Sequence, residues 1–326
     1  MRLLTVWIPN GDYLMGKLDV LETLYRFNDR IQVIVTCQDI QEFMAKNEII
    51  KKFDDYHFID RISLIDVKPL VSGLYFKIIY GQDSLNLHSF EELLKTVESF
   101  VRTQKSVDLF VNDYSIRNHE KIAVVSYRKN FKEDDITNWY ETKGLSKKYI
   151  PVAALTFKSE LLNKTVNDCH SNIERGNMLI TLLTFIKSER LYYLNECVYN
   201  HNDLNIMSFD SIVIYNSTDE EHNFIDNLVA VSSFDVSPIK SRKLKSYLLN
   251  QYIMMMYAYL LKLGSEQDVD VQAIRYYVVG AIKNKELQQF LNNKRSRNFL
   301  DSLTSKNKMQ KALSMHKLKQ YFNLIV

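Results

Sequence analysis

The residues with the clearest chemical potential follow an apolar run that reads Tyr75-Phe-Lys-Ile-Ile-Tyr80-Gly81-Gln82-Asp83. Only Asp83 is acidic among the polar residues that end this run, because Tyr80 and Gln82 bear a phenol and an amide. Carboxylate oxygens are ligands that Mg²⁺ and Mn²⁺ prefer, and such a cation neutralises phosphate charge. Asp83 is therefore a candidate ligand for Mg²⁺ or Mn²⁺, with water completing the coordination shell.

A second group of acidic residues lies between residues 53 and 68. Asp54 and Asp55, followed by Asp66 and Lys68, imitate the Asp…Asp-x-Lys spacing of metal-dependent nucleases. The motif is short and arises often by chance. A metal-dependent nuclease is therefore kept as an alternative function from a different class.

Strand-like and helix-like segments alternate through the first part of the chain. Apolar runs favour strands, whereas apolar residues at helical spacing favour helices. The expected strands are 3–8, 31–35, 62–65, 74–79, 107–111, 121–127 and 191–194, and the expected helices are 19–27, 40–53, 89–103, 155–162 and 177–186. This alternation predicts an α/β fold with a doubly wound, mostly parallel sheet.

Composition excludes several classes of function. The 8 Gly and 4 Pro are too few and too scattered for a phosphate-binding Gly-rich loop. The three cysteines lack the C-x-x-C spacing of a zinc site, and their wide separation fits a reducing cytoplasm. We expect the opening apolar run to be a buried strand rather than a signal peptide. The sequence does not show the interleaved basic and aromatic residues that are typical of RNA-binding proteins, so we do not expect nucleic-acid binding.

Charge is distributed unevenly along the chain. Residues 240–326 contain 16 Lys and Arg against 5 Asp and Glu, while residues 1–239 contain 26 against 34. We therefore place a domain boundary at residue 237, with a basic, all-helical C-terminal domain over 238–326. Its expected helices are 244–263, 270–281, 285–291 and 308–322.

The basic helices leave three interpretations open. Their charges form a solvated face, bind an acidic partner, or give peripheral contact with the inner face of an anionic membrane. The apolar run 247–261 is about 15 residues long, which is short for a spanning helix. It is either a buried packing helix or a helix lying on a membrane surface.

Four segments, in order, resemble landmarks of family 2 glycosyltransferases, the inverting enzymes of GT-A fold. Leu4-Thr-Val-Trp-Ile-Pro9 is similar to the first strand of that family, and Ile31-Gln-Val-Ile-Val35 to its second. The segment ending in Asp83 is similar to the strand and Asp-x-Asp-Asp motif, and 187–199 to the Tyr-Leu-x-Glu segment beyond the catalytic base. The resemblance covers residues 1 to about 215 and points to bacterial enzymes of surface polysaccharide or glycoprotein assembly. Residues 154–162 are likewise similar to a helix on the acceptor side of such enzymes.

The resemblance implies a nucleotide-sugar site near Pro9, Asp39 and Asp83, with the cation on Asp83. The alternating Asp positions of the family are Tyr80 and Gln82 here, and the nucleotide-binding Asp of its second strand is replaced by Thr36 and Cys37. Asp39 lies further on, and is either a substitute ligand or the N-cap of the next helix.

The general base that inversion requires is also displaced. Counting back from Tyr192 places the family's acid near residues 177–178, which are not acidic. Glu174 is the candidate catalytic base, and its alternative role is a solvated glutamate in a first helical turn.

Altered nucleotide, metal and base positions favour a degenerate, non-catalytic or assisting subunit over an active transferase. The first hypothesis is therefore a glycosyltransferase-like protein that works by binding, with a partner subunit or as a homo-oligomer. The second is an active but divergent nucleotide-sugar-dependent glycosyltransferase that uses Asp83 and Glu174. The nuclease is the third.

Overall fold

The protein is described here by a computed structural model with an α/β fold. It describes residues 2–9, 11–14, 19–60, 64–80, 83–118, 121–144, 150–162, 184–185 and 187–202. The chain divides into two compact units, and the first comprises Met1–Lys143 and Ile150–Ile206. The expected boundary at 237, the basic helical domain 238–326 and the apolar run 247–261 lie outside the described residues and stay predictions.

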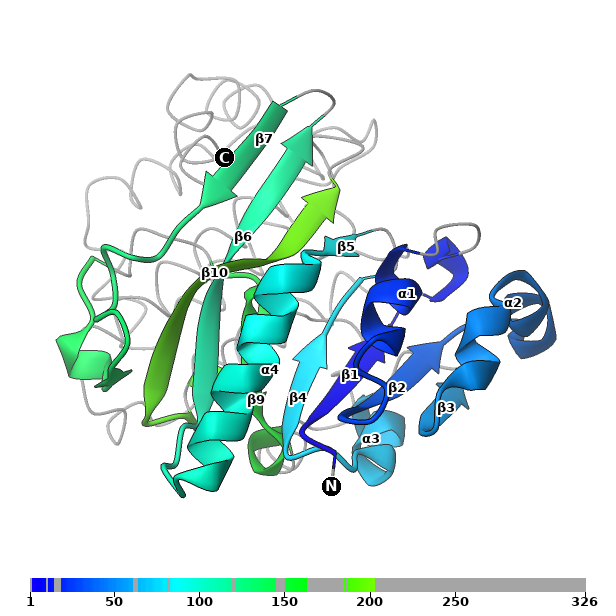
Figure 1. The fold of residues 1–326 in the computed structure, drawn as a ribbon, viewed down its shortest axis with the longest axis horizontal. Coiled ribbons are helices and arrows are strands. Elements are labelled where there is room, and N and C mark those ends of the chain that lie inside the picture. The colour runs from blue at the N-terminus through cyan, green and yellow to red at the C-terminus, as the bar shows by residue number, and fades with distance from the viewer. Residues whose placement is uncertain are drawn as a thin grey trace, which may run out of the picture. The chain divides into compact units, whose positions relative to one another are not determined.

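The described strands form one mixed sheet in the order β3-β2-β1-β4-β9-β6-β10-β5, with β7 beside β6 and β8 beside β10 (Figure 1). The strands are β1 (Leu4–Ile8), β2 (Ile31–Thr36), β3 (Tyr56–Ile59), β4 (Tyr75–Ile78), β5 (Ser84–Leu85), β6 (Leu109–Asn118), β7 (Lys121–Val125), β8 (Ile136–Thr137), β9 (Leu155–Lys158) and β10 (Leu191–Asn202).

Four neighbouring strands, β3, β2, β1 and β4, run parallel, as expected from the alternating pattern. The sheet then changes direction, because β9 pairs antiparallel with both β4 and β6. The predicted helix 155–162 is therefore wrong for its first four residues, which form β9, and only residues 159–162 begin a helix. Phe157 faces Phe76 and Leu109 in the register, so burial between two strands decided the conformation.

The described helices are α1 (Asp19–Tyr25), α2 (Ile40–Lys46), α3 (Leu64–Val67) and α4 (Leu87–Arg102), with 3-10 turns η1 (Gly11–Leu14), η2 (Glu48–Lys52), η3 (Lys68–Leu70), η4 (Trp139–Glu141) and η6 (Val152–Ala154). Helix α4 lies on one face of the sheet (Figure 1), where it buries Phe90, Leu93, Leu94 and Val97. Its start is fixed by Asn86, whose side chain accepts a hydrogen bond from the Ser89 N–H at 3.2 Å.

Two further expectations need correction. The expected strand 62–65 is wrong, because Leu64 and Ile65 belong to α3 and the strand of this region is β3. The expected single helix 40–53 is two pieces, since α2 ends at Lys46 and η2 follows. Asn47 separates them with a backbone outside the helical region and a side chain that donates to the Phe43 carbonyl oxygen at 3.0 Å.

Strand β10 is longer than the expected 191–194 and is interrupted twice. It pairs parallel with β6, from Leu191 opposite Leu109 to Asn202 opposite Arg117. The register shifts between Leu194 and Cys197 and again between Cys197 and Tyr199. Three residues of β10, namely Asn195, Glu196 and Val198, therefore have no register partner on β6.

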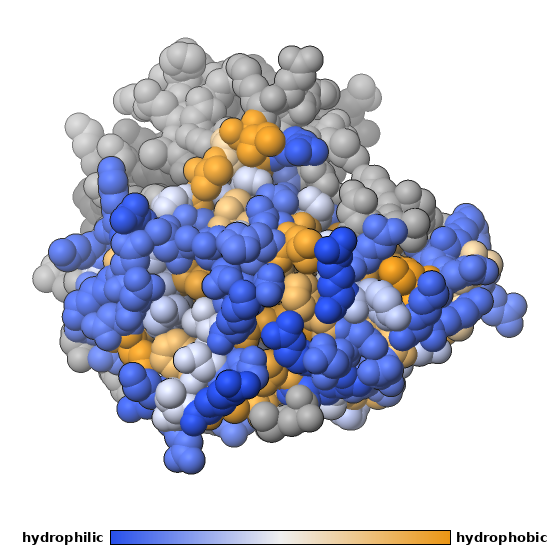
Figure 2. Space-filling model, in the orientation of Figure 1, coloured by the Kyte–Doolittle hydropathy of each residue, from blue (hydrophilic) through white to orange (hydrophobic). Residues whose placement is uncertain are grey.

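The core lies on both faces of the sheet. All five residues of β1 and all six of β2 are buried, as expected of central parallel strands. The surface in Figure 2 is mostly hydrophilic, with apolar side chains in small patches. Within the described part of the chain, no helix is long and apolar enough to cross a membrane.

Candidate functional site

Three segments of the predicted site meet at one edge of the sheet. Strands β1, β2 and β4 are parallel, so the residues that follow them, Pro9, Cys37 and Tyr80, lie at the same carboxyl edge. The turn after Pro9 packs tightly here, because a Cβ on Gly11 would come within 2.5 Å of the Val35 side chain. Ligands of parallel α/β sheets bind outside this kind of edge, so it is the candidate site.

The residues that replace the family's nucleotide-binding Asp have structural roles. The Thr36 hydroxyl accepts a hydrogen bond from the Trp7 indole at 2.9 Å, and Cys37 is buried with its N–H bonded to the Ile59 carbonyl. Asp39 is the N-cap of α2, where its carboxylate accepts from the Glu42 N–H at 2.8 Å. Of the two roles predicted for Asp39, the helix cap is therefore confirmed.

Asp83 lies opposite His201 because of strand pairing. The short strand β5 runs antiparallel to β10, with Ser84 opposite Asn200 and Leu85 opposite Tyr199. Continuing that register by one residue brings Asp83 to His201, and the His201 Nδ1 lies 3.0 Å from the Asp83 Oδ1. The Tyr199 hydroxyl donates to the other carboxylate oxygen, Oδ2.

The Asp83 carboxylate is fully buried, whereas the His201 side chain is 12% exposed. A buried carboxylate needs hydrogen-bond donors or a cation beside it, because burial otherwise disfavours the charged form. The Tyr199 hydroxyl and the His201 ring lie within hydrogen-bond distance of this carboxylate and meet that need. The imidazole is the member of the pair that reaches the surface.

The His201 Nδ1 and the Asp83 Oδ1 lie at hydrogen-bond distance, and the same separation is compatible with two ligands of one divalent cation. Two ligand atoms about 2.1 Å from an octahedral metal and at a right angle to each other are about 3.0 Å apart, which matches the observed separation. The described residues contain no group of three or more His, Cys, Asp or Glu arranged for a metal. Two protein ligands suffice where substrate phosphates and water supply the remaining oxygens, as is usual for such cations.

Sequence reasoning found Asp83 but missed His201 and Tyr199. The available signal was the aromatic segment beginning at Leu191, which continues as one strand to Asn202. Glu174, the predicted catalytic base, and Gln82 lie outside the described residues. Pro9 is buried directly after β1, at the expected edge.

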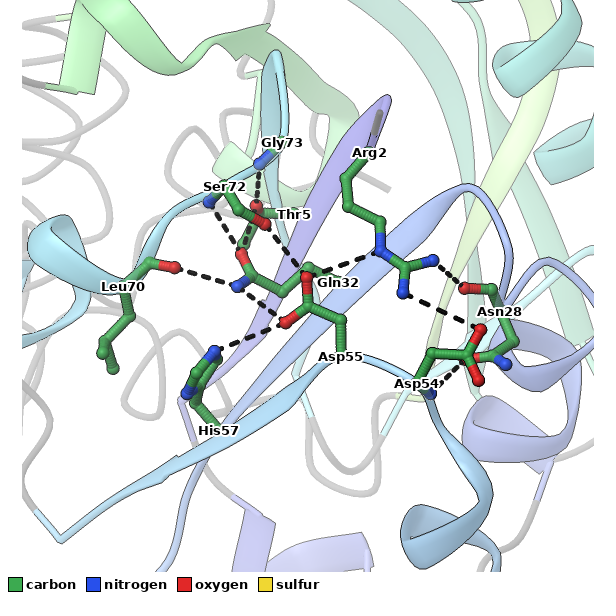
Figure 3. Close-up of polar contacts among 10 residues, drawn as sticks. All are labelled: Arg2, Thr5, Asn28, Gln32, Asp54, Asp55, His57, Leu70, Ser72 and Gly73. Carbon is green, nitrogen blue, oxygen red and sulfur yellow. Dashed lines mark hydrogen bonds and ion pairs between the residues drawn. The ribbon is translucent and has the colours of Figure 1, made fainter.

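Two acidic residues of the nuclease hypothesis, Asp54 and Asp55, belong to a network at the opposite, amino edge of the sheet (Figure 3), whereas Asp66 lies in α3. The Asp55 carboxylate contacts the Arg2 guanidinium at 3.4 Å, the Gln32 amide at 3.1 Å, the Ser72 hydroxyl at 3.1 Å and the His57 ring at 3.3 Å. Gln32 belongs to β2 and His57 to β3, while Arg2 and Ser72 lie in the segments just before β1 and β4. The geometry is that of a structural crosslink, and it gives the nuclease hypothesis no support.

Two buried polar groups lie between the edges. Lys77 of β4 is completely buried, and its Nζ donates to the Ala153 carbonyl at 2.6 Å and approaches Leu155 O and Asn112 Oδ1 at 3.4 and 3.5 Å. Burial lowers the pKa of this lysine from its usual 10.5 to about 7. It fastens the turn before β9 to β4 and β6.

Asp113 of β6 is the second such group. Its Oδ1 accepts from the Tyr127 N–H at 2.8 Å and from the Tyr193 hydroxyl at 2.9 Å. Burial, more than the neighbouring Asp113 charge, raises the pKa of the Tyr193 phenol. Asp113 therefore ties β6 to β10 and to the segment after β7, which is a structural role.

Solved structures of S. aureus TarS share this fold. The crystal structure of TarS residues 1–349 in complex with UDP-GlcNAc has a TM-score of 0.63 and 12% identity, and covers 98% of this chain and 92% of that one. The same TarS fragment without a named ligand has a TM-score of 0.59 and 13% identity, over 98% of this chain and 92% of that one. Against a longer TarS chain the TM-score is 0.59 at 10% identity, and the match covers 100% of this chain but 55% of TarS.

These likenesses establish the fold and no more. No protein-family model and no curated protein matches the chain. The GT-A-like fold expected for residues 1–237 is confirmed, within the described residues, as a mixed α/β sheet with a parallel core. The chain spans about half the length of the longer TarS chain.

Proposed function

We propose that this chain is a glycosyltransferase-like protein that binds a nucleotide sugar at the carboxyl edge of its sheet. In this proposal Asp83 and His201 hold a divalent cation against the diphosphate. The observation that carries the proposal is the 3.0 Å approach of the His201 Nδ1 to the buried Asp83 carboxylate at that edge. A TarS fragment of the same fold binds UDP-GlcNAc, which supports a nucleotide sugar as the ligand class.

The chemistry of the two side chains favours Mn²⁺ over Mg²⁺. Mg²⁺ takes oxygen ligands almost exclusively, whereas the softer imidazole nitrogen suits transition metals. When bound, the cation would neutralise the charge of the diphosphate group. Asp83 and His201 themselves hold the site together, since the carboxylate anchors the imidazole at the surface of the protein.

Two observations support the assisting, non-catalytic form of this function. Thr36 is engaged by Trp7 and Asp39 caps α2, so the groups that replace the family's nucleotide contact have other partners. Transfer would further require a base such as Glu174 to deprotonate the acceptor. An active, divergent transferase is the second form of the proposal. A place in bacterial surface glycan assembly, cytoplasmic location and contact with a membrane or a partner subunit stay predictions.

Calorimetric titration of the full chain with UDP-sugars tests the proposal. We expect binding in the presence of Mn²⁺, and a loss of affinity of roughly 100-fold or more in Asp83→Ala or His201→Gln, because each removes a metal ligand. His57→Gln is the matched control, since His57 also pairs with an aspartate but lies at the amino edge. Equal affinity with Mn²⁺ and with EDTA would contradict the cation, and no binding of any UDP-sugar would contradict the function.

Release of UDP separates the two forms of the proposal. A protein that binds the UDP-sugar but releases no UDP, with or without glycan acceptors, would act by binding alone. UDP release that Glu174→Gln abolishes without weakening the binding would instead identify an active transferase.

A further inference from the structure

Tyr199 contacts both members of the proposed cation site. Its hydroxyl donates a hydrogen bond to the Asp83 Oδ2, and its ring lies nearly parallel to the His201 ring, with centroids 6.4 Å apart and an interplanar angle of 20°. Tyr199 itself is 2% exposed. It is therefore a buried side chain that fixes the orientation of the two residues next to it, without reaching the surface.

The hydrogen bond distinguishes the two oxygens of the Asp83 carboxylate. Oδ2 is held by Tyr199, and Oδ1 faces His201. A terminal carboxylate rotates easily about its last side-chain bond. A hydrogen-bond donor that is fixed on Oδ2 prevents this rotation. The Asp83 Oδ1 then stays directed toward the His201 imidazole.

Tyr199 is itself held from both sides by the sheet. It lies opposite Leu85 of β5 and opposite Tyr114 of β6, so its backbone is fixed between two strands. Sites built on strands hold their geometry more closely than sites on loops. The position of the hydroxyl is thus determined by the same pairing that brings Asp83 to His201.

We propose that Tyr199 is the positioning residue of the cation site, which sets the affinity of the Asp83–His201 pair for a divalent metal. This inference rests on the proposed function. Groups that orient a metal ligand without touching the metal commonly contribute roughly 10- to 100-fold in affinity. Tyr199 accordingly acts through Asp83 and does not contact the substrate.

A purely structural role, in which the tyrosine only satisfies a buried carboxylate, predicts a different result. It would lower the stability of the fold and leave metal affinity unchanged in the folded protein. Tyr114 offers a matched control, because it is also buried, faces Tyr199 in the register and directs its side chain to Tyr127.

The test measures Mn²⁺ binding to the full chain by electron paramagnetic resonance of the free ion, with and without UDP. Wild type, Tyr199→Phe and Tyr114→Phe are compared at a temperature at which circular dichroism shows all three folded. We expect Tyr199→Phe to weaken Mn²⁺ binding by roughly 10- to 100-fold and Tyr114→Phe to leave it unchanged. Replacement of Tyr199 by para-aminophenylalanine, which keeps an N–H donor at the same place, should restore most of the affinity.

The outcomes separate the inference from the function it rests on. If wild type binds Mn²⁺ and Tyr199→Phe binds it equally well, the positioning role is overturned and the proposed function stands. Equal losses in the two Phe variants would also overturn it, since a general loss of packing then explains them. If wild type does not bind Mn²⁺, the proposed cation site is wrong, and the positioning role of Tyr199 is overturned with it. If Tyr199→Phe does not fold, the para-aminophenylalanine protein decides, because weakened binding there would contradict the role of the donor.

Discussion

The two edges of the parallel sheet each carry a buried or half-buried aspartate, and they hold it differently. At the amino edge, Asp55 is joined to groups from β2, from β3 and from the segments just before β1 and β4 (Figure 3). At the carboxyl edge, Asp83 meets Tyr199 and His201, which come from the single strand β10.

The difference concerns what each carboxylate is placed to do. A carboxylate joined to two strands and to the segments that lead into two others contributes to stability, because moving any of them would break its contacts. A carboxylate held by one neighbouring strand, beside an imidazole that reaches the surface, keeps a fixed position and can still share its charge with a cation. Under the proposed function, similar acidic residues in the sequence therefore have a structural role at one edge and a cation-binding role at the other.

Breaking the amino-edge network should have the largest effect on stability. The Gln32 Oε1 accepts from the Thr5 hydroxyl at 2.7 Å and the Ser72 N–H at 2.9 Å, while its Nε2 donates to Asp55 and to the Leu70 carbonyl. Gln32→Leu removes these four hydrogen bonds, and the Thr5 O–H, the Ser72 N–H and the Leu70 carbonyl lose the partner that Gln32 provides. An unsatisfied buried group costs about 1–3 kcal/mol, so we expect a loss of about 4 kcal/mol in the free energy of unfolding.

Urea unfolding measures this loss, and Gln41→Leu on the exposed side of α2 is the control. Mn²⁺-dependent binding of the UDP-sugar should persist in Gln32→Leu wherever the protein is folded. A selective loss of binding with little change in stability would contradict the division of roles between the edges.

Lys77, which lies between the two edges, should give stability a dependence on pH. Its pKa is lowered to about 7 in the folded protein but is about 10.5 when unfolded, so the unfolded chain binds the extra proton between these values. The penalty is fully present below pH 7, and stability rises with pH through that window, by at most about 1.4 kcal/mol per pH unit. Lys77→Met should lack this rise. If the free energy of unfolding changes in the same way with pH in both proteins from pH 7 to 9.5, the role of Lys77 in the pH dependence is wrong.

The smallest effect is expected at Asp39, and it sharpens the boundary of the carboxyl-edge site. Asp39→Ala removes the N-cap of α2 and should lower the free energy of unfolding by about 1 kcal/mol. Affinity for the UDP-sugar should not change. The control is Asp29→Ala, which changes an exposed aspartate before β2. If Asp39→Ala weakens nucleotide binding and Asp29→Ala does not, Asp39 contributes to the nucleotide site.

The parallel core was predictable because its signals are local. Runs such as 31–35 are apolar and β-branched, and the sheet pairs them as expected in β2. The helix expected at 89–103 is α4, which begins two residues earlier at Leu87 because Asn86 supplies the cap. Such features depend on residues within one or two turns of each other.

The remaining features depend on distant pairing. Residues 155–158 have apolar residues compatible with either conformation, and the antiparallel contacts with β4 and β6 make them a strand. Asp83 was found because its neighbours resemble a known motif, whereas His201 lies 118 residues away and joins it only through the β5–β10 pairing. One sequence gives no sign of that pairing.

The irregular stretch of β10 has a consequence for tolerance to insertion and deletion. Between the pairs Leu194–Asn112 and Tyr199–Tyr114, β10 advances by five residues while β6 advances by two. The three additional residues, Asn195, Glu196 and Val198, therefore set which residues of β6 and β5 lie opposite Tyr199. Removing one of them should shift the register of the residues that follow, and so move Tyr199 and His201 relative to Asp83. The pairing of Leu191–Leu194 with β6 should remain, so the site is expected to be more sensitive than the sheet to a change of length in this stretch.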